Sequence, residues 1–304
     1  MGGLVRPGVW WWLAATVLAG VMSADARSQA AERAEPLKGL LVTGGCCHDY
    51  ASQKRIITEG LSQRINIVWD VVHEGGTSRT HKVSIYHKPD WSAGYDVVVH
   101  NECFGGVADD AFLENIVRGH RDTGVAAVFI HCALHSYRSA PKAVEQWREL
   151  IGVSSKSHER HRSVLVKNLR PTHPVMRGFP RQWQTPNGEL YKIFKVWPNC
   201  TPLAEAFGQD TQQNHTVVWV NTCGKARVFG TSLGHHNETM NNDVWLGLVA
   251  RGTLWACGKL RDDGTPQPGY EGTGIRPIVL GPLRPQTDPQ FRKRDGAAKP
   301  KKRN

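Results

Sequence analysis

The sequence lacks the patterns that mark several common classes of protein. It has no paired CxxC motifs, so a structural zinc module is not indicated. It has no helix-turn-helix, zinc-finger or aromatic RNA-binding motif, and we therefore expect no nucleic-acid partner. Beyond the N-terminus, no apolar run approaches the roughly 18 residues that a membrane span requires. Since no internal repeat or domain linker is evident either, we expect one compact domain.

The first 26 residues have the features of a secretory signal peptide. Arg6 precedes a 13-residue apolar run at 9–21, and Ala24-Asp25-Ala26 offers a cleavage site made of small residues. The run is too short for a membrane span, although a short membrane anchor is the alternative interpretation. We therefore predict a signal peptide over residues 1–26 and a periplasmic or secreted protein with no stable membrane span.

Basic residues exceed acidic ones, and part of that excess lies at the C-terminus. The chain has 38 Lys and Arg against 27 Asp and Glu, and residues 259–304 hold 11 of the former and 5 of the latter. This stretch is rich in proline and glycine, a composition that buries too little apolar surface to fold alone. We predict a disordered basic tail over 259–304, either simply solvated or adhering to an anionic cell surface or polymer.

Seven cysteines occur in the chain, two of them adjacent at Cys46 and Cys47. Disulfides are allowed in an exported protein, and the odd number leaves at least one cysteine without a partner in the same chain. The spacing does not reveal which cysteines pair. Cys132 follows a predicted strand, and we interpret it as a buried structural residue rather than a nucleophile.

Apolar strands alternate with helical stripes through the first half of the chain. Continuous apolar strands of this kind are typical of a parallel sheet with helices on both faces. After about residue 158, short strands at close intervals predict an antiparallel extension, and a last helix is predicted at 241–255. The pattern therefore predicts an α/β fold over residues 37–258, with a three-layer, doubly wound, mostly parallel sheet and an antiparallel extension.

Three histidines each follow the end of a predicted strand: His48, His131 and His235. Since the carboxyl ends of parallel strands share one edge of the sheet, these imidazoles can converge there. Three neutral imidazoles that leave an open position are typical of a catalytic zinc site. We therefore predict that they act in catalysis and bind a divalent metal, zinc being the first choice. Structural histidines are the alternative, and only one of His235 and His236 should face the site.

Other polar residues lie near the same predicted edge. Glu189 is a candidate general base, and Tyr191 can donate a hydrogen bond to a developing oxyanion. A solvated turn carboxylate is the alternative for Glu189 and also for Glu102. The candidates for substrate binding are Asn101, Glu102, His135, Arg138 and His158.

Four segments together resemble the ThuA-like (trehalose-utilisation) family. Residues 217–235 contain VVW and CGKARVFGTSLGH, which resemble the family's W…GKGRVFYTSLGH. VFIHCA at 128–133 is similar to its GIHAA elbow, and two further segments resemble its HP…GLP and DE.Y motifs: HP…GFP at 173–180 and ELY at 189–191. The resemblance covers residues 38–258 and implies a flavodoxin-like fold similar to that of class I glutamine amidotransferases.

The resemblance also suggests a function. Amidotransferases have a cysteine at the elbow where this chain has His131, so ammonia release through a cysteinyl thioester is not expected. The family implies carbohydrate catabolism, here of a small carbohydrate such as a 3-keto-glycoside supplied by a partner sugar dehydrogenase. Cleavage would be a histidine- or metal-assisted elimination or hydrolysis, with no nucleotide cofactor.

Two alternatives remain at this point. One is a non-catalytic carbohydrate-binding protein of the cell envelope, and the other is an amidotransferase-like hydrolase that uses Cys132. Three residues depart from the family pattern, namely Cys132, His135 and Ala226. We therefore expect the pocket lining, and with it the substrate, to differ from those of other members.

Overall fold

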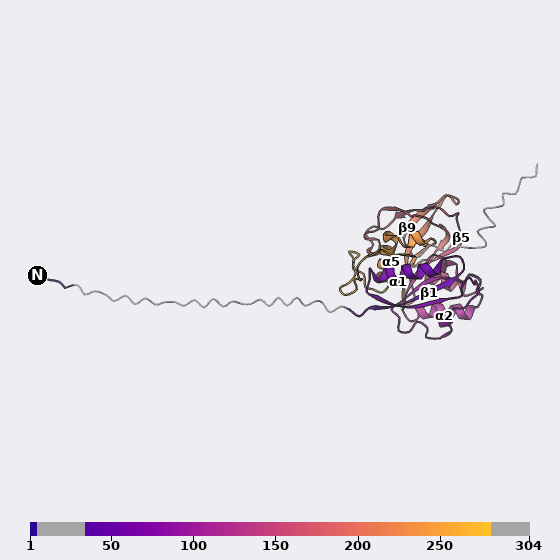
Figure 1. The fold of residues 1–304 in the computed structure, drawn as a ribbon, viewed down its shortest axis with the longest axis horizontal. Coiled ribbons are helices and arrows are strands. Elements are labelled where there is room, and N and C mark those ends of the chain that lie inside the picture. Colours follow the sequence, from indigo (N-terminus) through magenta and orange to yellow (C-terminus); the bar gives the residue numbers. More distant parts are fainter. Residues whose placement is uncertain (5–33, 281–304) are drawn as a thin grey trace, which may run out of the picture. The chain divides into compact units, whose positions relative to one another are not determined.

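The computed structural model describes residues 1–4 and 34–280. The chain divides into residues 1–32 and residues 33–304, and all helices and strands described here belong to the second unit (Figure 1). Nearly all of the predicted signal peptide lies outside the described residues. Among the described helices, none is long and apolar enough to cross a membrane.

A nine-stranded sheet in the order β2-β1-β3-β4-β11-β10-β9-β6-β7 forms the centre of the second unit. Its parallel part contains β1 (Leu37–Gly45), β2 (Ile67–Glu74), β3 (Val97–Cys103), β4 (Ala126–Ile130) and β11 (Ala226–Thr231). Its antiparallel part contains β10 (Gln213–Cys223), β9 (Thr201–Gly208), β6 (Leu165–Asn168) and β7 (Gln182–Gln184). The predicted α/β fold, with a parallel sheet and an antiparallel extension, is confirmed.

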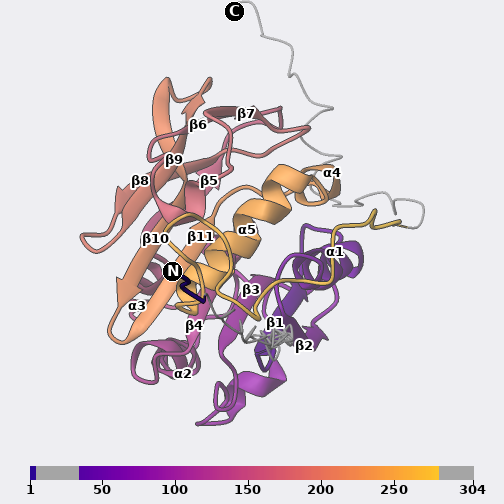
Figure 2. The ribbon, with the colours of Figure 1, turned by 90° about the vertical axis from the view of Figure 1, so that its left-hand side faces the viewer.

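Helices cover both faces of the parallel part. On one face, α1 (Tyr50–Ser62) and α5 (Asp243–Ala256) lie next to each other, and Figure 2 shows both against the sheet. On the other face lie α2 (Asp110–Arg121) and α3 (Val144–Ile151). Alternate residues of the strands point to opposite faces: Leu41 packs in the α1 and α5 core, and Leu40 in the α2 and α3 core. Two separate cores explain why the strand sequences are apolar almost throughout.

The antiparallel region differs from the prediction in its details. Although it follows residue 158, β8 (Tyr191–Val196) does not join the extension but pairs with β5 (Val153–His158) in a separate two-stranded sheet. The strands β5, β7 and β9 were not predicted. β9 begins with a Thr-Pro pair, a signal that normally argues against a strand. The short helices are η1 (Ser84–His87), η2 (His131–His135), η3 (Pro174–Met176) and α4 (Asn237–Met240).

Part of the predicted disordered tail packs on the domain. The Asn66 amide donates to the carbonyl of Tyr270, Glu271 forms a β-bridge with Ile65, and Ile278 is buried in the core beside α1 and α5. For residues 259–280 the prediction was wrong, because these contacts anchor a segment whose composition alone is poor in core residues. The remaining residues, 281–304, lie outside the described part of the chain.

Candidate active site

The turn from β4 into η2 determines where His131 lies. His131 has a φ of +45°, an uncommon and costly value for a residue other than glycine. Its Nδ1 lies 2.6 Å from the carbonyl oxygen of Ser232, which follows β11. Since that oxygen can only accept, Nδ1 carries the proton and donates. The ring is thereby oriented with Nε2 directed towards Glu189, 3.1 Å from its Oε2 atom.

The structure brings His48, His131 and His235 together. Their ring centroids are 4.6 Å apart for His48 and His235, 5.1 Å for His48 and His131, and 5.3 Å for His131 and His235. Each offers one nitrogen within 4.8 Å of the others. The three side chains follow the ends of β1, β4 and β11, as the strand ends had predicted. His235 lines the cleft, whereas His236 packs beside His235 and His161.

Glu189 lies at the centre of this histidine cluster. Its Oε2 is 3.1 Å from His131 Nε2 and 3.2 Å from His235 Nδ1, and its Oε1 is 2.7 Å from His161 Nε2 and 3.1 Å from His158 Nδ1. Burial alone would raise the pKa of Glu189, but hydrogen bonds from His131, His161 and His235 hold that pKa well below its usual value. The carboxylate therefore stays ionised at neutral pH.

His161 was not among the residues predicted for the site. It lies in the loop after β5, in a sequence with several polar residues that gives no sign of burial. Its contact with Glu189 is the shortest that this carboxylate makes with a histidine. The spacing His158-x-x-His161 beside a strand was the only available signal, and it is common in surface loops.

The residues present fit a divalent metal. His48 Nδ1 is buried and, within the described part of the chain, has no hydrogen-bond partner. Burial, together with the neighbouring His235 and His131, holds the pKa of His48 well below its usual value. His48 is therefore neutral, which is the form that binds a metal. A neutral imidazole with an unsatisfied buried nitrogen, facing two other imidazoles, is a donor set that zinc prefers.

Cysteines border the same site. Gly45, with a φ of +97°, brings the loop after β1 so close to β3 that a Cβ there would lie 2.4 Å from the Cys103 carbonyl oxygen. Cys46 Sγ lies 3.7 Å from Cys103 Sγ, and Cys103 forms a disulfide with Cys132. A sulfur in a disulfide is not a nucleophilic thiolate, so the structure favours the interpretation of Cys132 as a structural residue.

A cleft of about 470 Å³ opens onto His48, His235 and Glu189. His135, Arg138, His158 and Tyr191, all predicted site residues, line it. The Tyr191 ring stacks on His135 with centroids 4.0 Å apart, and burial, with the nearby Glu189 charge, raises the pKa of Tyr191 well above its usual value. Burial also lowers the pKa of His135 to about 3. The cleft thus offers a phenol that stays protonated and an imidazole that stays neutral.

A family model described as trehalose utilisation, ThuA, matches residues 52–256. The chain belongs to the ThuA family. Among solved structures, it resembles a ThuA-like protein from Parabacteroides merdae with 20% identity and a TM-score of 0.58, covering 77% of this chain and 97% of that one. It also resembles a ThuA-like protein from Bacteroides uniformis with 14% identity and a TM-score of 0.57, covering 78% and 98%. A search of curated proteins finds no match.

Two residues predicted to bind substrate do not reach the cleft of this ThuA protein. Strand β3 continues to Cys103, so Asn101 and Glu102 lie inside the sheet rather than beyond its edge. Glu102 is fully buried, and its carboxylate contacts His100 Nδ1 at 2.9 Å and accepts hydrogen bonds from Tyr86 and Tyr137. It is a structural carboxylate of the α2 side, and its predicted role is wrong.

Asn101 acts on the site of this ThuA protein indirectly, through Gln53. Its Nδ2 donates to Oε1 of Gln53 on α1, and Gln53 Nε2 donates to the carbonyl oxygens of Gly234 and His235. Asn101 therefore helps to hold the loop that carries His235. Its predicted contact with substrate is replaced by an indirect, positioning role.

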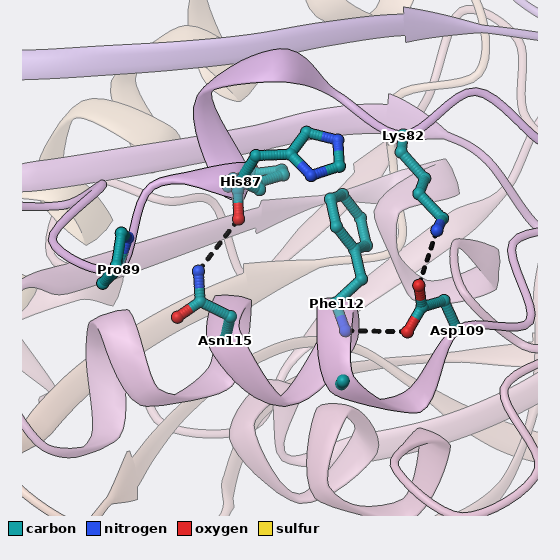
Figure 3. A pocket seen from close by; sticks show the side chains of 8 residues that line it. Lys82, His87, Pro89, Asp109, Phe112 and Asn115 are labelled. Carbon is teal, nitrogen blue, oxygen red and sulfur yellow. Dashed lines mark hydrogen bonds and ion pairs between the residues drawn. The ribbon is translucent and has the colours of Figure 1, made fainter.

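Two other cavities of this ThuA protein lack such chemistry. In the pocket of about 280 Å³ beside α2 (Figure 3), three polar residues already have partners. Lys82 pairs with Asp109, which also caps α2 through the Phe112 amide, and Asn115 donates to the carbonyls of Tyr86 and Lys88. The other, of about 420 Å³, lies along β6 and β9 and contains no histidine or cysteine. The histidine cleft is the best candidate for a catalytic site.

Proposed function

We propose that this ThuA protein is an enzyme of carbohydrate catabolism that cleaves a glycoside, a 3-keto-glycoside in the first instance, by elimination or hydrolysis. A divalent metal, zinc for preference, would assist. The observation that carries the proposal is the convergence of His48, His131 and His235. Of these, His48 and His235 line the cleft together with Glu189, and His131 lies buried directly behind them. The family description, trehalose utilisation, supports a carbohydrate as the substrate.

His48, His131 and His235 would hold the ion. When bound, it supplies a positive charge that polarises a substrate carbonyl oxygen and makes the adjacent C–H bond more acidic. The hydrogen bond from His131 Nδ1 to the Ser232 carbonyl fixes that ring, and its Nε2, which contacts Glu189 in this structure, would face the ion. The Gln53 contacts do the same for the backbone at His235. The protein thus holds the His131 ring and the backbone that carries His235 in place through its own hydrogen bonds.

Glu189 would act as the base. It is ionised and borders the cleft, so one of its oxygens can accept a proton from a substrate carbon next to a keto group. Its low pKa makes it a weak base by itself. His158 and His161 contact Oε1 directly and stabilise its negative charge. The proton taken from the substrate carbon would pass from Glu189 to the leaving glycosidic oxygen, and this step would restore the carboxylate for the next turnover.

Tyr191 would donate to developing negative charge. Its raised pKa keeps the phenol protonated at neutral pH, and it lines the cleft beside His131, with ring centroids 4.3 Å apart. A protonated donor held in place before the reaction stabilises an oxyanion without reorganisation. Elimination needs one base and one such donor, and Glu189 and Tyr191 supply them.

The proposal includes export of the protein. Its support is the signal-like sequence of residues 1–26 together with the Cys103–Cys132 disulfide, since disulfides persist mainly in oxidising compartments. A partner sugar dehydrogenase would form the keto group on the substrate. The proposed cleavage itself uses no nucleotide cofactor.

The test combines metal analysis with turnover of 3-keto-disaccharides. We expect purified protein to retain about one divalent ion per chain, and His131→Ala and His48→Ala to lose both the ion and turnover. The matched control is His87→Ala, an exposed histidine outside the cleft, which should retain both. Metal-free wild-type protein, or turnover by His131→Ala, would overturn the proposal. Sugar binding without turnover would favour a carbohydrate-binding protein instead.

A further inference from the structure

The cleft that contains the histidines is bordered by an excess of positive charge. Arg79, Arg138 and Lys156 line it, and all three are exposed. Glu189 is the only carboxylate among the lining residues, and its charge is already engaged by histidines. Within residues 34–280, no ion pair involves any of the three cations.

The two arginines are held on either side of a Gly-Gly turn. A Cβ at Gly105 would lie 2.9 Å from the His135 carbonyl oxygen and 3.1 Å from Arg138 Nε, so a glycine here favours the close approach of both groups to the turn. Ser139 Oγ donates to the Gly105 carbonyl oxygen at 2.8 Å, which fixes the backbone next to Arg138. On the other side, the Gly106 amide donates to the Arg79 carbonyl oxygen at 2.8 Å. The backbone at both arginines is therefore tied to the cleft wall.

A neutral glycoside does not require these charges. Cations gathered at the mouth of a cleft repel one another and destabilise the empty state, while a bound anion relieves that repulsion. The planar guanidinium group of arginine matches carboxylate, sulfate and phosphate oxygens in a bidentate arrangement. Two arginines and a lysine with no acidic partner are the residues expected where an anionic group of a ligand binds.

We propose that the cleft binds a glycoside that carries an anionic group, a carboxylate or a sulfate or phosphate ester, held by Arg79 and Arg138. Lys156 contributes positive charge at the same cleft. The inference rests on the proposed function, which makes the substrate a glycoside. What it adds is that this glycoside carries a negative charge. With the anionic group at the arginines, the remainder of the sugar extends towards His48, His131 and Glu189.

The test measures equilibrium binding of glucuronate, glucose 6-sulfate, glucose 6-phosphate and neutral glucose by calorimetry. We expect at least one anionic sugar to bind ten or more times more tightly than glucose, and the arms of the experiment identify which group is preferred. In the double variant Arg79→Gln/Arg138→Gln that preference should disappear. Equal affinity for charged and neutral sugars, or a preference that survives the double variant, would overturn the inference.

Two further variants separate this inference from the proposed function. His131→Ala should abolish turnover but keep the preference for anions, so loss of one property does not imply loss of the other. Arg181→Gln, an exposed arginine that does not line the cleft, should leave sugar binding unchanged. Arg138→Lys retains charge but not the bidentate geometry and should give an intermediate preference. An Arg181→Gln effect equal to that of the double variant would indicate nonspecific charge and would contradict the inference.

Discussion

At the scale of single residues, Glu189 is the group on which the histidine cluster most depends. It contacts four imidazoles, and its ionised form is stabilised by three of them. Replacing it by glutamine removes the charge and turns one of its two acceptor oxygens into an NH2 donor, so the imidazoles lose part of their acceptor. Carboxylates that orient metal-binding histidines affect metal affinity strongly when they are replaced.

We predict that Glu189→Gln weakens zinc affinity by about 10- to 100-fold. The measurement is competition with a chromogenic chelator at pH 7. The matched control is Glu205→Gln. Glu205 lies on β9, three strands away from β4 in the sheet, and contacts Lys167, so its replacement should leave zinc affinity unchanged. Unaltered zinc binding by Glu189→Gln would show that the cluster does not depend on this carboxylate.

Single residues also show what the sequence could and could not predict. His48, His131 and His235 were predictable because each follows a strand of the parallel sheet, and such strands end at one edge. His161 was not predictable, because its approach to Glu189 depends on the separate pairing of β5 with β8. Glu102 was placed at the edge of the sheet, but β3 continues to Cys103 and keeps it in the interior.

At the scale of elements, the turn after β1 depends on a glycine. Gly45 and Gly94 have similar positive φ values, +97° and +85°, but their surroundings differ. A Cβ at Gly45 would collide with the Cys103 carbonyl oxygen at 2.4 Å, whereas a Cβ at Gly94 would meet nothing within 4 Å. Substituting alanine at Gly94 therefore measures the free-energy cost of the positive φ alone, and substituting it at Gly45 measures that cost plus the cost of the collision.

We predict that Gly94→Ala lowers the free energy of unfolding by about 1 to 2 kcal/mol, the conformational cost alone. Gly45→Ala should exceed that loss by at least about 1 kcal/mol, since the backbone must also shift. Because the shift moves His48, zinc affinity should fall in Gly45→Ala only. Urea unfolding and chelator competition measure the two effects, and equal behaviour of the variants would contradict the role assigned to the turn.

Helix α2 carries a buried histidine, His120, that makes the stability of the domain depend on pH. Its His120 is fully buried, with Nδ1 2.8 Å from the Val125 carbonyl oxygen and Nε2 2.9 Å from His100 Nε2. Burial, and then the neighbouring His100, lower the pKa of His120 to about 3. Below about pH 6.5 the unfolded chain gains a proton that the folded chain does not, so stability falls as the pH decreases towards 3.

We predict that between pH 7 and pH 5 the wild-type protein loses about 2 kcal/mol more of its unfolding free energy than His120→Gln does. Urea denaturation at the two pH values provides the measurement. His87→Gln, which replaces an exposed histidine, should follow the wild type. Identical pH dependence in wild type and His120→Gln would mean that His120 is not a source of acid sensitivity.

Elements also differ in how well their sequences predict them. The parallel strands were predictable because two helical layers bury both faces and leave a continuous apolar signature. The pairing of β8 with β5 was not predictable, because strand partners in an antiparallel region depend on which surfaces meet in space. The same applies to β9, which lies between β10 and β6. Its Thr-Pro start is a signal that argues against a strand.

At the scale of the whole molecule, the Cys103–Cys132 disulfide joins the ends of β3 and β4 across 29 residues of sequence. Closing a loop of this length restricts the unfolded chain and is expected to contribute about 3 to 4 kcal/mol. The bridge also lies in the wall of the histidine cleft. It therefore links the stability of the domain to the shape of the site.

We predict that Cys103→Ser/Cys132→Ser lowers the free energy of unfolding by about 3 kcal/mol under oxidising conditions. Adding a reductant to the wild-type protein should reduce its stability to that of the variant. Chemical denaturation with and without reductant tests both statements. A wild-type protein insensitive to reductant, with a variant of equal stability, would show that the bridge contributes little.

The sequence by itself determined the layered α/β fold and the edge of the sheet where the site lies, because hydrophobic periodicity and the direction of parallel strands are local properties. It also placed His48, His131 and His235 at that edge. Only the tertiary structure decided that Glu189 joins four histidines, that Glu102 is buried, and that Cys103 pairs with Cys132. These depend on contacts between segments far apart in the chain, and no local pattern specifies such contacts.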